Sequence, residues 1–303
     1  MSHFFGLILR AFKACKILNL VRNFGHFIVY SNLYVAFCAF SLAVFSLKAL
    51  DYKADNNLLA FIFFATLFAY NFQRRISLLE KTNSTSSWQN KWISRNKSLS
   101  NIITVFSFTA CLYFLYFLPH DSLLLIAPLS LISLLYVLRI GRQPALRNIP
   151  FLKVFIVAFV WGGAMILLPT LYFSNDFYSI FSLKAQSLSF ALSLFIFGLS
   201  LPFDIRDISD DSIAQLKTIP AKMGVKKTIL ICWLSFLLSS IVFLVCFKHH
   251  FITSEVFASL LITIAISAFM VYLTKKPKHH LFYGLLLEGC LLLPLTVYYF
   301  LIF

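Results

Sequence analysis

The chain has 303 residues, of which 60% are hydrophobic and 12% charged, with a mean hydropathy of +0.86. Soluble domains are nearer one quarter charged, so these figures exclude an ordinary globular protein. They predict an all-α, polytopic membrane protein. The net charge of +15 does not indicate nucleic-acid binding, because the basic residues follow the pattern that sets the orientation of membrane proteins.

The predicted elements begin with a basic cytoplasmic segment, residues 1–26, which lacks the small-residue cleavage site of a signal peptide. Nine apolar segments follow, each long enough or nearly long enough to cross the bilayer as a helix. They cover residues 27–47, 57–73, 101–118, 121–138, 150–172, 184–203, 227–247, 252–273 and 281–302. We expect one domain over residues 1–303, with the nine helices packed around a central cavity.

The loops between these segments also carry structural signals. Only Pro119 and His120 separate the third and fourth segments, which predicts a tight helical hairpin. In the polar loop 74–100, Trp88 and Trp92 lie four residues apart among basic residues, which favours a short amphipathic helix at the membrane interface. A second large polar loop covers residues 204–227.

The basic residues predict the orientation. With the N-terminus in the cytoplasm, the tail and the loops after helices two, four, six and eight carry 4, 6, 4, 5 and 3 Lys or Arg residues, 22 in all. The opposite face carries the remaining 4. This asymmetry predicts an N-in, C-out protein whose two large polar loops are cytoplasmic. A bacterial inner membrane is the expected location.

An acidic cluster stands out in the second polar loop. On one helix, Asp204, Asp207 and Asp211 at i, i+3 and i+7 share a narrow arc of one face. Three such carboxylates repel one another unless a cation lies among them, and hard oxygen ligands suit Mg²⁺. The cluster therefore indicates a catalytic metal–diphosphate site at the membrane edge. The alternative is a solvated loop in which aspartates favour the start of the next helix.

The residues around this cluster resemble a known family. Asp204-x-x-Asp207-x-x-x-Asp211, followed by Gln215-Leu216-Lys217-Thr218-Ile219-Pro220-Ala221-Lys222-Met223-Gly224, is similar to the second aspartate motif of the UbiA superfamily of intramembrane prenyltransferases. The basic stretch from Tyr136 to Lys153 resembles the loop between helices four and five of that family. The resemblance implies that Mg²⁺ binds at the three aspartates.

The family's first motif, NDxxDxxxD, is degenerate in this chain. Asn71 is kept, whereas Phe72, Arg75 and Leu79 stand at the three acidic positions. Arginine binds phosphate without a metal, so Arg74 and Arg75 are interpreted as a clamp for the diphosphate. The alternative is that both arginines only anchor the cytoplasmic end of their helix.

The resemblance implies transfer of a polyprenyl group from an isoprenyl diphosphate to a lipid-soluble acceptor. The predicted substrate-binding residues are Asn71, Arg74, Arg75, Arg142, Arg147, Lys153 and Lys217. A second hypothesis is a catalytically impaired relative that binds isoprenoid lipid or serves as a membrane carrier or assembly protein. A transporter is the third, and the position of the polar clusters at one face counts against it.

The sequence does not decide the roles of two sets of polar residues within the predicted spans. Asn32 and Asn71 could hydrogen-bond between helices or line the polar end of the cavity. Glu288 lies within the last predicted span, where a carboxylate is costly and usually faces a cavity or a partner. No catalytic role is assigned to it from the sequence.

Overall fold

The computed structural model describes residues 23–80, 88–139, 141, 144–213 and 217–303. These ranges contain α-helices and no β-strand, which confirms the predicted all-helical class. Residues 23–30 are helical. The helices that follow are α2 (Leu33–Leu50), α3 (Asn56–Glu80), α4 (Trp88–Arg95), α5 (Lys97–Tyr116), α6 (Leu123–Leu135), α7 (Leu152–Gly162), α8 (Leu168–Ser174), α9 (Leu183–Arg206), α10 (Ile208–Ile213), α11 (Ile219–Lys248), α12 (Ser254–Leu273) and α13 (Leu293–Ile302).

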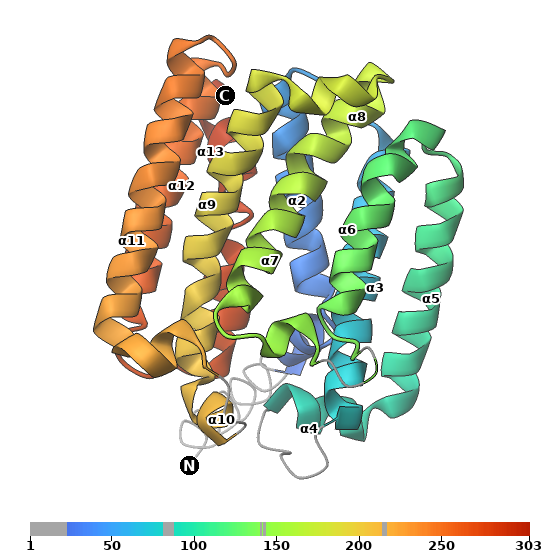
Figure 1. The fold of residues 1–303 in the computed structure, drawn as a ribbon, viewed down its shortest axis with the longest axis vertical. Coiled ribbons are helices and arrows are strands. Elements are labelled where there is room, and N and C mark those ends of the chain that lie inside the picture. Colours follow the sequence, from blue (N-terminus) through green and yellow to red (C-terminus); the bar gives the residue numbers. More distant parts are fainter. Residues whose placement is uncertain (1–22, 81–87, 140, 142–143, 214–216) are drawn as a thin grey trace, which may run out of the picture.

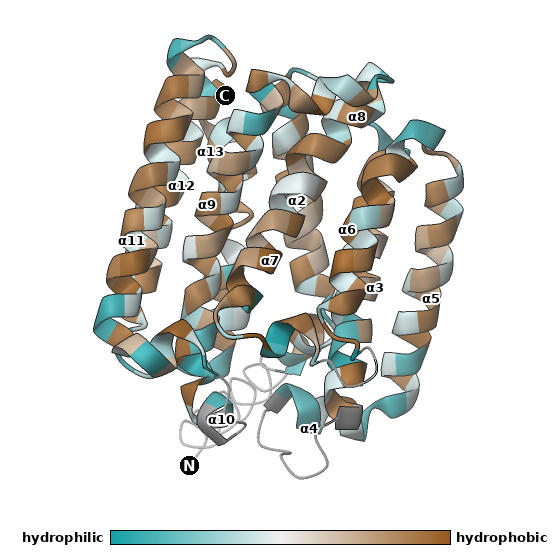
Figure 2. Ribbon diagram, viewed as in Figure 1, coloured by the Kyte–Doolittle hydropathy of each residue, from teal (hydrophilic) through white to brown (hydrophobic). Residues whose placement is uncertain are grey.

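The long helices run side by side in one bundle (Figure 1), with α2 beside α3, α7 beside α9, and α9 beside α11. The short helices α4 and α10 gather at one end of this bundle, and the C-terminus lies at the other. Figure 2 shows hydrophobic residues along the helix bodies and hydrophilic residues concentrated at the end that carries α4 and α10. That end holds both predicted site loops.

Six stretches of the described chain are long and apolar enough to cross a membrane. They are Leu33–Leu50, Lys97–Tyr116, Leu152–Ser174, Leu183–Arg206, Ile219–Lys248 and Ser254–Leu273. The outer faces of α5 and α11 expose many large apolar side chains, such as Val105 and Leu237, which are 62% and 56% exposed. Such faces fit lipid rather than water, so the protein is an integral membrane protein.

Helix α9 is fixed against α11 by polar contacts between neighbouring helices. Ser235 Oγ donates to the carbonyl of Leu194 at 2.6 Å, and Ser239 Oγ donates to the carbonyl of Ala191 at 2.7 Å. Small hydroxyl side chains of this kind let helices approach closely and satisfy their donors inside a membrane protein. This packing sets the position of the C-terminal end of α9, which carries the first aspartate.

Helix α7 approaches α9 from the other side because Gly162 has no side chain. A Cβ atom at this position would lie 2.8 Å from the backbone carbonyl of Ser189. The backbone then continues through the π-helical segment η3 (Gly163–Leu167) into α8. The close approach brings the start of α7, with Lys153, beside the end of α9.

Two predicted spans are interrupted, so their description as continuous helices is wrong. In the first, the helix breaks before Leu33 because Asn32 adopts a left-handed conformation with φ 61°, which asparagine tolerates better than most residues. In the last, the π-helical segment η5 (Phe282–Leu287) is followed by a turn at residues 290–292. Pro294, at the start of α13, supplies no backbone N–H to continue the helix.

Candidate functional site

A buried ion pair joins the two helices at the polar end. Lys153, in the first turn of α7, places its Nζ 2.5 Å from Oδ1 of Asp204 on α9. Asp204 is 2% exposed, and this contact neutralises its charge. A charged carboxylate at such depth needs a partner of this kind, because an unpaired one loses its hydration without compensation.

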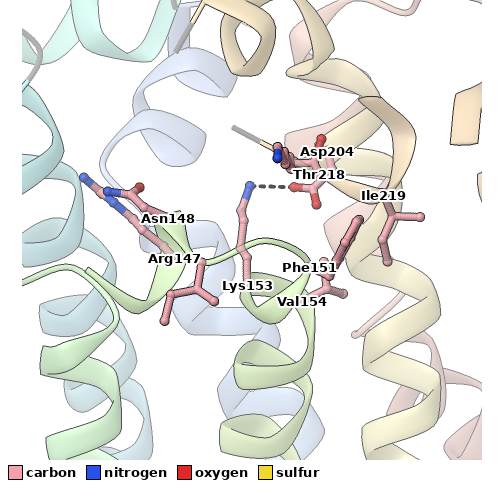
Figure 3. A pocket seen from close by; sticks show the side chains of 10 residues that line it. Arg147, Asn148, Phe151, Lys153, Val154, Asp204, Thr218 and Ile219 are labelled. Carbon is pink, nitrogen blue, oxygen red and sulfur yellow. Dashed lines mark hydrogen bonds and ion pairs between the residues drawn. The ribbon is translucent and has the colours of Figure 1, made fainter. Parts of the chain in front are cut away.

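The ion pair borders a small pocket of about 10 Å³ between α7, α9 and the start of α11. Figure 3 shows Lys153 reaching Asp204 across this pocket, with Phe151, Thr218 and Ile219 beside them. The backbone N–H of Phe151 donates to the carbonyl of Lys217 at 3.3 Å, which ties the two loops together. The side chains of two predicted substrate residues, Arg147 and Lys217, also line the pocket.

The second aspartate carries its own counter-ion. Arg206 Nε and Nη2 donate to the two carboxylate oxygens of Asp207 at 2.7 and 2.9 Å. Burial raises the pKa of Asp207, but the charge and hydrogen bonds of Arg206 outweigh it, so the pKa lies below its usual value. The Arg206 guanidinium also lies 5.3 Å and 5.5 Å from the ring centres of Phe203 and Tyr283.

The third aspartate is buried without such a partner. Asp211, on α10, is 8% exposed, and its Oδ2 has no hydrogen-bond partner among the described residues. Burial raises its pKa to about 6, while Lys153 lowers it and the other two aspartates raise it further. The Thr218 hydroxyl lies near this carboxyl and lowers its pKa, but neither Asp211 Oδ2 nor Thr218 Oγ1 completes a hydrogen bond of good geometry within the described chain. Buried polar atoms of this kind are rare unless a water, an ion or a ligand satisfies them.

The expectation that one helix carries all three aspartates is wrong. Helix α9 ends at Arg206, Asp207 has φ −94° and ψ 7°, and α10 begins at Ile208. No group of three acidic, histidine or cysteine side chains in the described ranges lies close enough to hold a metal ion. The site thus fits Mg²⁺ in part: Asp211 offers a free oxygen, while Asp204 and Asp207 are already neutralised by basic residues.

Asn71 forms a buried bridge between helices. It accepts from Asn32 Nδ2 at 3.1 Å, and its own amide donates to the carbonyls of Ser31 and Leu67 at 3.0 and 2.9 Å. Of the two alternatives for Asn32 and Asn71, the structure therefore shows the interhelical hydrogen bond. These bonds also satisfy the backbone where the first helix breaks. The role of Asn71 in the geometry is to hold this break together.

The arginines of the degenerate first motif have different surroundings. Arg74 donates to Oε1 of Gln89 on α4 at 2.5 Å, and Gln89 in turn donates to Asn32. Arg75 is half-buried and has no hydrogen bond or ion pair in the part of the chain that the structure describes. Arg74 is thus oriented by α4, and it acts electrostatically on Arg206 and Asp207.

The remaining predicted basic residues divide between pocket and loop. Arg147 donates to the hydroxyl of Ser77 on α3, and its side chain points away from the Lys153–Asp204 pair (Figure 3). Lys217 is exposed at the rim of the pocket. Arg142 lies outside the described residues.

A larger cavity of about 180 Å³ opens on the other side of the ion pair. Its walls combine apolar side chains with a few polar groups that come from α2, α3, α7, α9 and the last interrupted helix. The lining residues are Val35, Tyr70, Gln73, Tyr136, Lys153, Val154, Val157, Trp161, Ile196, Leu199, Ser200, Phe203, Asp204, Glu288 and Leu291. The mixture fits a molecule with a polar end and an apolar body.

Three residues of the site have no role in the sequence analysis. Arg206 pairs with Asp207, Gln89 orients Arg74, and Thr218 lines the small pocket. Arg206 stands between two of the aspartates in the sequence, and that adjacency is a signal that could have found it. Nothing in the sequence indicates Gln89, because its partners are distant along the chain.

Comparisons with known proteins agree with this architecture. The model of the UbiA prenyltransferase family matches residues 91–283. A UbiA homolog from Aeropyrum pernix K1 has 15% sequence identity and a TM-score of 0.63, with 88% of this chain and 98% of that chain covered. A UbiA homolog from Archaeoglobus fulgidus has 11% identity and a TM-score of 0.61, covering 90% and 99%.

A third structure belongs to a digeranylgeranylglyceryl phosphate synthase. It has 13% identity and a TM-score of 0.55, with 90% of this chain and 97% of that chain covered. At these identities the three structures show a shared fold. A comparison with curated proteins finds no match.

Proposed function

This chain belongs to the UbiA prenyltransferase family, and on that premise we propose that it transfers a polyprenyl group from an isoprenyl diphosphate to a lipid-soluble acceptor. The observation that carries the proposal is the Lys153–Asp204 pair, which lies between a polar pocket and a largely apolar cavity. A prenyl diphosphate likewise combines a charged head with an apolar tail. Such a ligand places its tail in the cavity and its head beside the Lys153–Asp204 pair, because the pocket of about 10 Å³ holds no more than a water-sized group.

The basic side chains supply the contacts for the diphosphate. Lys153 is the central one, because it borders both spaces and its ammonium can exchange Asp204 for a phosphate oxygen. Arg74, which binds Gln89 of α4, and Lys217, at the rim of the pocket, add positive charge. Arginine in this setting binds phosphate through paired hydrogen bonds, whereas lysine acts as a point charge.

Mg²⁺ completes the proposal. Asp211 would hold it through the buried oxygen that makes no hydrogen bond of good geometry in the described chain, and Asp204 and Asp207 would contribute only if their basic partners were released. When bound, the ion compensates the charge that develops on the departing diphosphate. The residues of the cavity exclude water, and the rings of Tyr70, Tyr136 and Trp161 offer aromatic faces to an allylic cation.

The orientation belongs to the same proposal. The basic loops put the polar end of the bundle on the cytoplasmic side of a bacterial inner membrane, with nine spans, the N-terminus inside and the C-terminus outside. A water-soluble diphosphate head then enters from the cytoplasm. The acceptor and the prenyl tail reach the cavity from the bilayer.

A second candidate function is binding of an isoprenoid lipid without turnover. It is favoured by the first motif, where Phe72 and Arg75 replace acidic residues and Asn71 is fully used in holding the helix break. The same fold would then serve as a membrane carrier or an assembly protein. Binding of the diphosphate with no transfer of the prenyl group would favour this function.

Calorimetry of the purified protein with farnesyl diphosphate, with and without Mg²⁺, tests the proposed site. We expect wild type to bind in the presence of Mg²⁺ and the Asp207→Asn plus Asp211→Asn variant to bind at least tenfold more weakly. Glu255→Gln, a half-buried position in the first turn of α12 that lines neither the pocket nor the cavity, is the matched control and should bind as wild type does. Equal binding by wild type and the double variant would remove the aspartates from the site.

A further inference from the structure

Glu288 is the one acidic side chain in the cavity wall apart from Asp204. It lies directly after η5, where the last helix is interrupted. Within the described ranges, no hydrogen bond or ion pair to its carboxylate is found. A carboxylate inside a membrane protein normally has a partner or faces a polar ligand. We therefore expect a ligand in the cavity to contact this carboxyl group.

The backbone around Glu288 is held rigidly. The hydroxyl of Tyr34 on α2 donates to the carbonyl of Leu285 at 2.9 Å, which supplies a partner in the π-helical segment. Gly289 is packed so tightly that a Cβ atom there would lie 2.7 Å from the same hydroxyl. π-Helical segments often occur at functional sites. The carboxylate is thus presented to the cavity from a fixed point.

The basic side chains near Glu288 bind other residues. Arg206 and Arg74 act on Glu288 electrostatically, but Arg206 binds Asp207 and Arg74 binds Gln89. Lys153, which also lines the cavity, binds Asp204. Glu288 lines the large cavity but not the small pocket beside Lys217 and Thr218, so it is not placed among the residues that bind the diphosphate. It belongs to the other molecule that the cavity receives.

We infer that Glu288 selects the acceptor by accepting a hydrogen bond from its hydroxyl or amine group. The inference rests on the proposed function, since it assigns the second substrate of the same site. Val35 and Leu291 border the cavity with Glu288 and surround the acceptor's apolar body. Glu288 is thereby a specificity-determining residue for a neutral or cationic, hydrogen-bond-donating lipid head.

Three small aromatic probes test the inference: 1-naphthol, 1-methoxynaphthalene and 1-naphthoate. Their binding to the purified full chain is measured by calorimetry without diphosphate or Mg²⁺, with protein-free micelles as the blank. We expect wild type to prefer 1-naphthol over its methyl ether by up to roughly tenfold, the size of one buried hydrogen bond. It should bind 1-naphthoate most weakly.

Two variants make the test specific to the carboxylate. Glu288→Gln keeps the size of the side chain, and we expect it to lose most of the preference for 1-naphthol. Glu255→Gln changes a glutamate outside the cavity lining and should leave all three affinities unchanged. A lower affinity for all three probes alike would indicate a damaged cavity and would count against the assignment.

The inference is overturned if wild type binds 1-naphthol no better than the methyl ether, if it binds no probe, or if Glu288→Gln keeps the same ranking. These outcomes do not depend on the diphosphate. If farnesyl diphosphate fails to bind while the probes rank as expected, the proposed function is contradicted. The protein would then be one that binds lipids in a cavity whose selectivity depends on Glu288.

Discussion

Lys153 and Asp204 neutralise one another at the boundary between pocket and cavity, and each depends on the other. Removing one partner of a buried ion pair leaves a charge without compensation, which costs about 3–5 kcal/mol. We therefore expect Lys153→Met to lower the stability of the protein by about 3 kcal/mol, measured as a lower thermal midpoint in detergent by circular dichroism. Binding of farnesyl diphosphate should be lost with it.

The double variant Lys153→Met plus Asp204→Leu separates the two effects. With both charges gone, the pocket holds no isolated carboxylate, so most of the lost stability should return. Diphosphate binding should remain absent. If Lys153→Met alone melts as wild type does, the ion pair does not carry the stability assigned to it here.

Asp211 gives the fold a pH dependence with a defined sign. Burial raises its pKa from 3.8 to about 6 in the folded protein. Between these two pH values the folded state holds a proton that the unfolded state has released, so stability falls as the pH rises from about 4 to about 6 and stays level above. Relative to Asp211→Asn, wild type should lose up to about 3 kcal/mol over this interval.

Thermal unfolding in metal-free buffer with a chelator, from pH 4 to pH 8, measures this difference. Asp121→Asn, at an exposed position before α6, is the matched control and should run parallel to wild type. A constant gap between wild type and Asp211→Asn over the whole range would show that Asp211 titrates at its ordinary value.

At the scale of the element, Gly224 sets the direction of α11. Its backbone has φ 80° and ψ 163°, which side chains other than glycine rarely adopt, and a Cβ atom there meets nothing within 4 Å. Gly224→Ala should therefore destabilise the protein by about 1–3 kcal/mol through backbone strain alone. The displaced first turn of α11 should also weaken diphosphate binding, because Thr218 and Ile219 line the pocket.

Gly25→Ala is the control for this change. Gly25 lies in a helix, and the nearest atom to an added Cβ is 3.9 Å away, so the substitution should be neutral or slightly stabilising. Equal melting curves for the two variants would mean that the kink at Gly224 carries no strain.

Several elements could be predicted from the sequence because their signals are local. The short connection predicted at Pro119 and His120 is present, with α5 ending at Tyr116 and α6 beginning at Leu123, although α5 packs mainly against α3 and not against α6. The helix expected around Trp88 and Trp92 is α4. The breaks at Asn32 and after Glu288 could not be predicted, because apolarity averaged over a segment is the same for a continuous and an interrupted helix.

The functional site, too, could be predicted only in part. The aspartates and the basic loop could be located from residue type and spacing, which are properties of the chain. Their partners could not: Lys153 and Asp204 are 51 positions apart, and Gln89 and Asn32 are 57 apart. Such pairs exist only once helices pack, and they decide which carboxylates are free.

At the scale of the whole molecule, the distribution of basic residues predicts which end faces the cytoplasm. In a variant without its native cysteines, a cysteine replacing Lys276 should react with a membrane-impermeant thiol reagent only from the cytoplasmic side. A cysteine replacing Lys53 should react only from the outside. Both positions are exposed, so accessibility depends on orientation alone. Labelling of both from the same side would contradict the topology.

The central claim is that this bundle transfers a prenyl group. The most direct test is to incubate membranes containing the protein with radiolabelled farnesyl diphosphate and Mg²⁺, and to separate the extracted lipids by chromatography. The account predicts a labelled lipid with wild type, at least tenfold less with Asp207→Asn plus Asp211→Asn, and none in membranes without the protein. Binding of farnesyl diphosphate with no labelled lipid would contradict the transferase and leave a carrier.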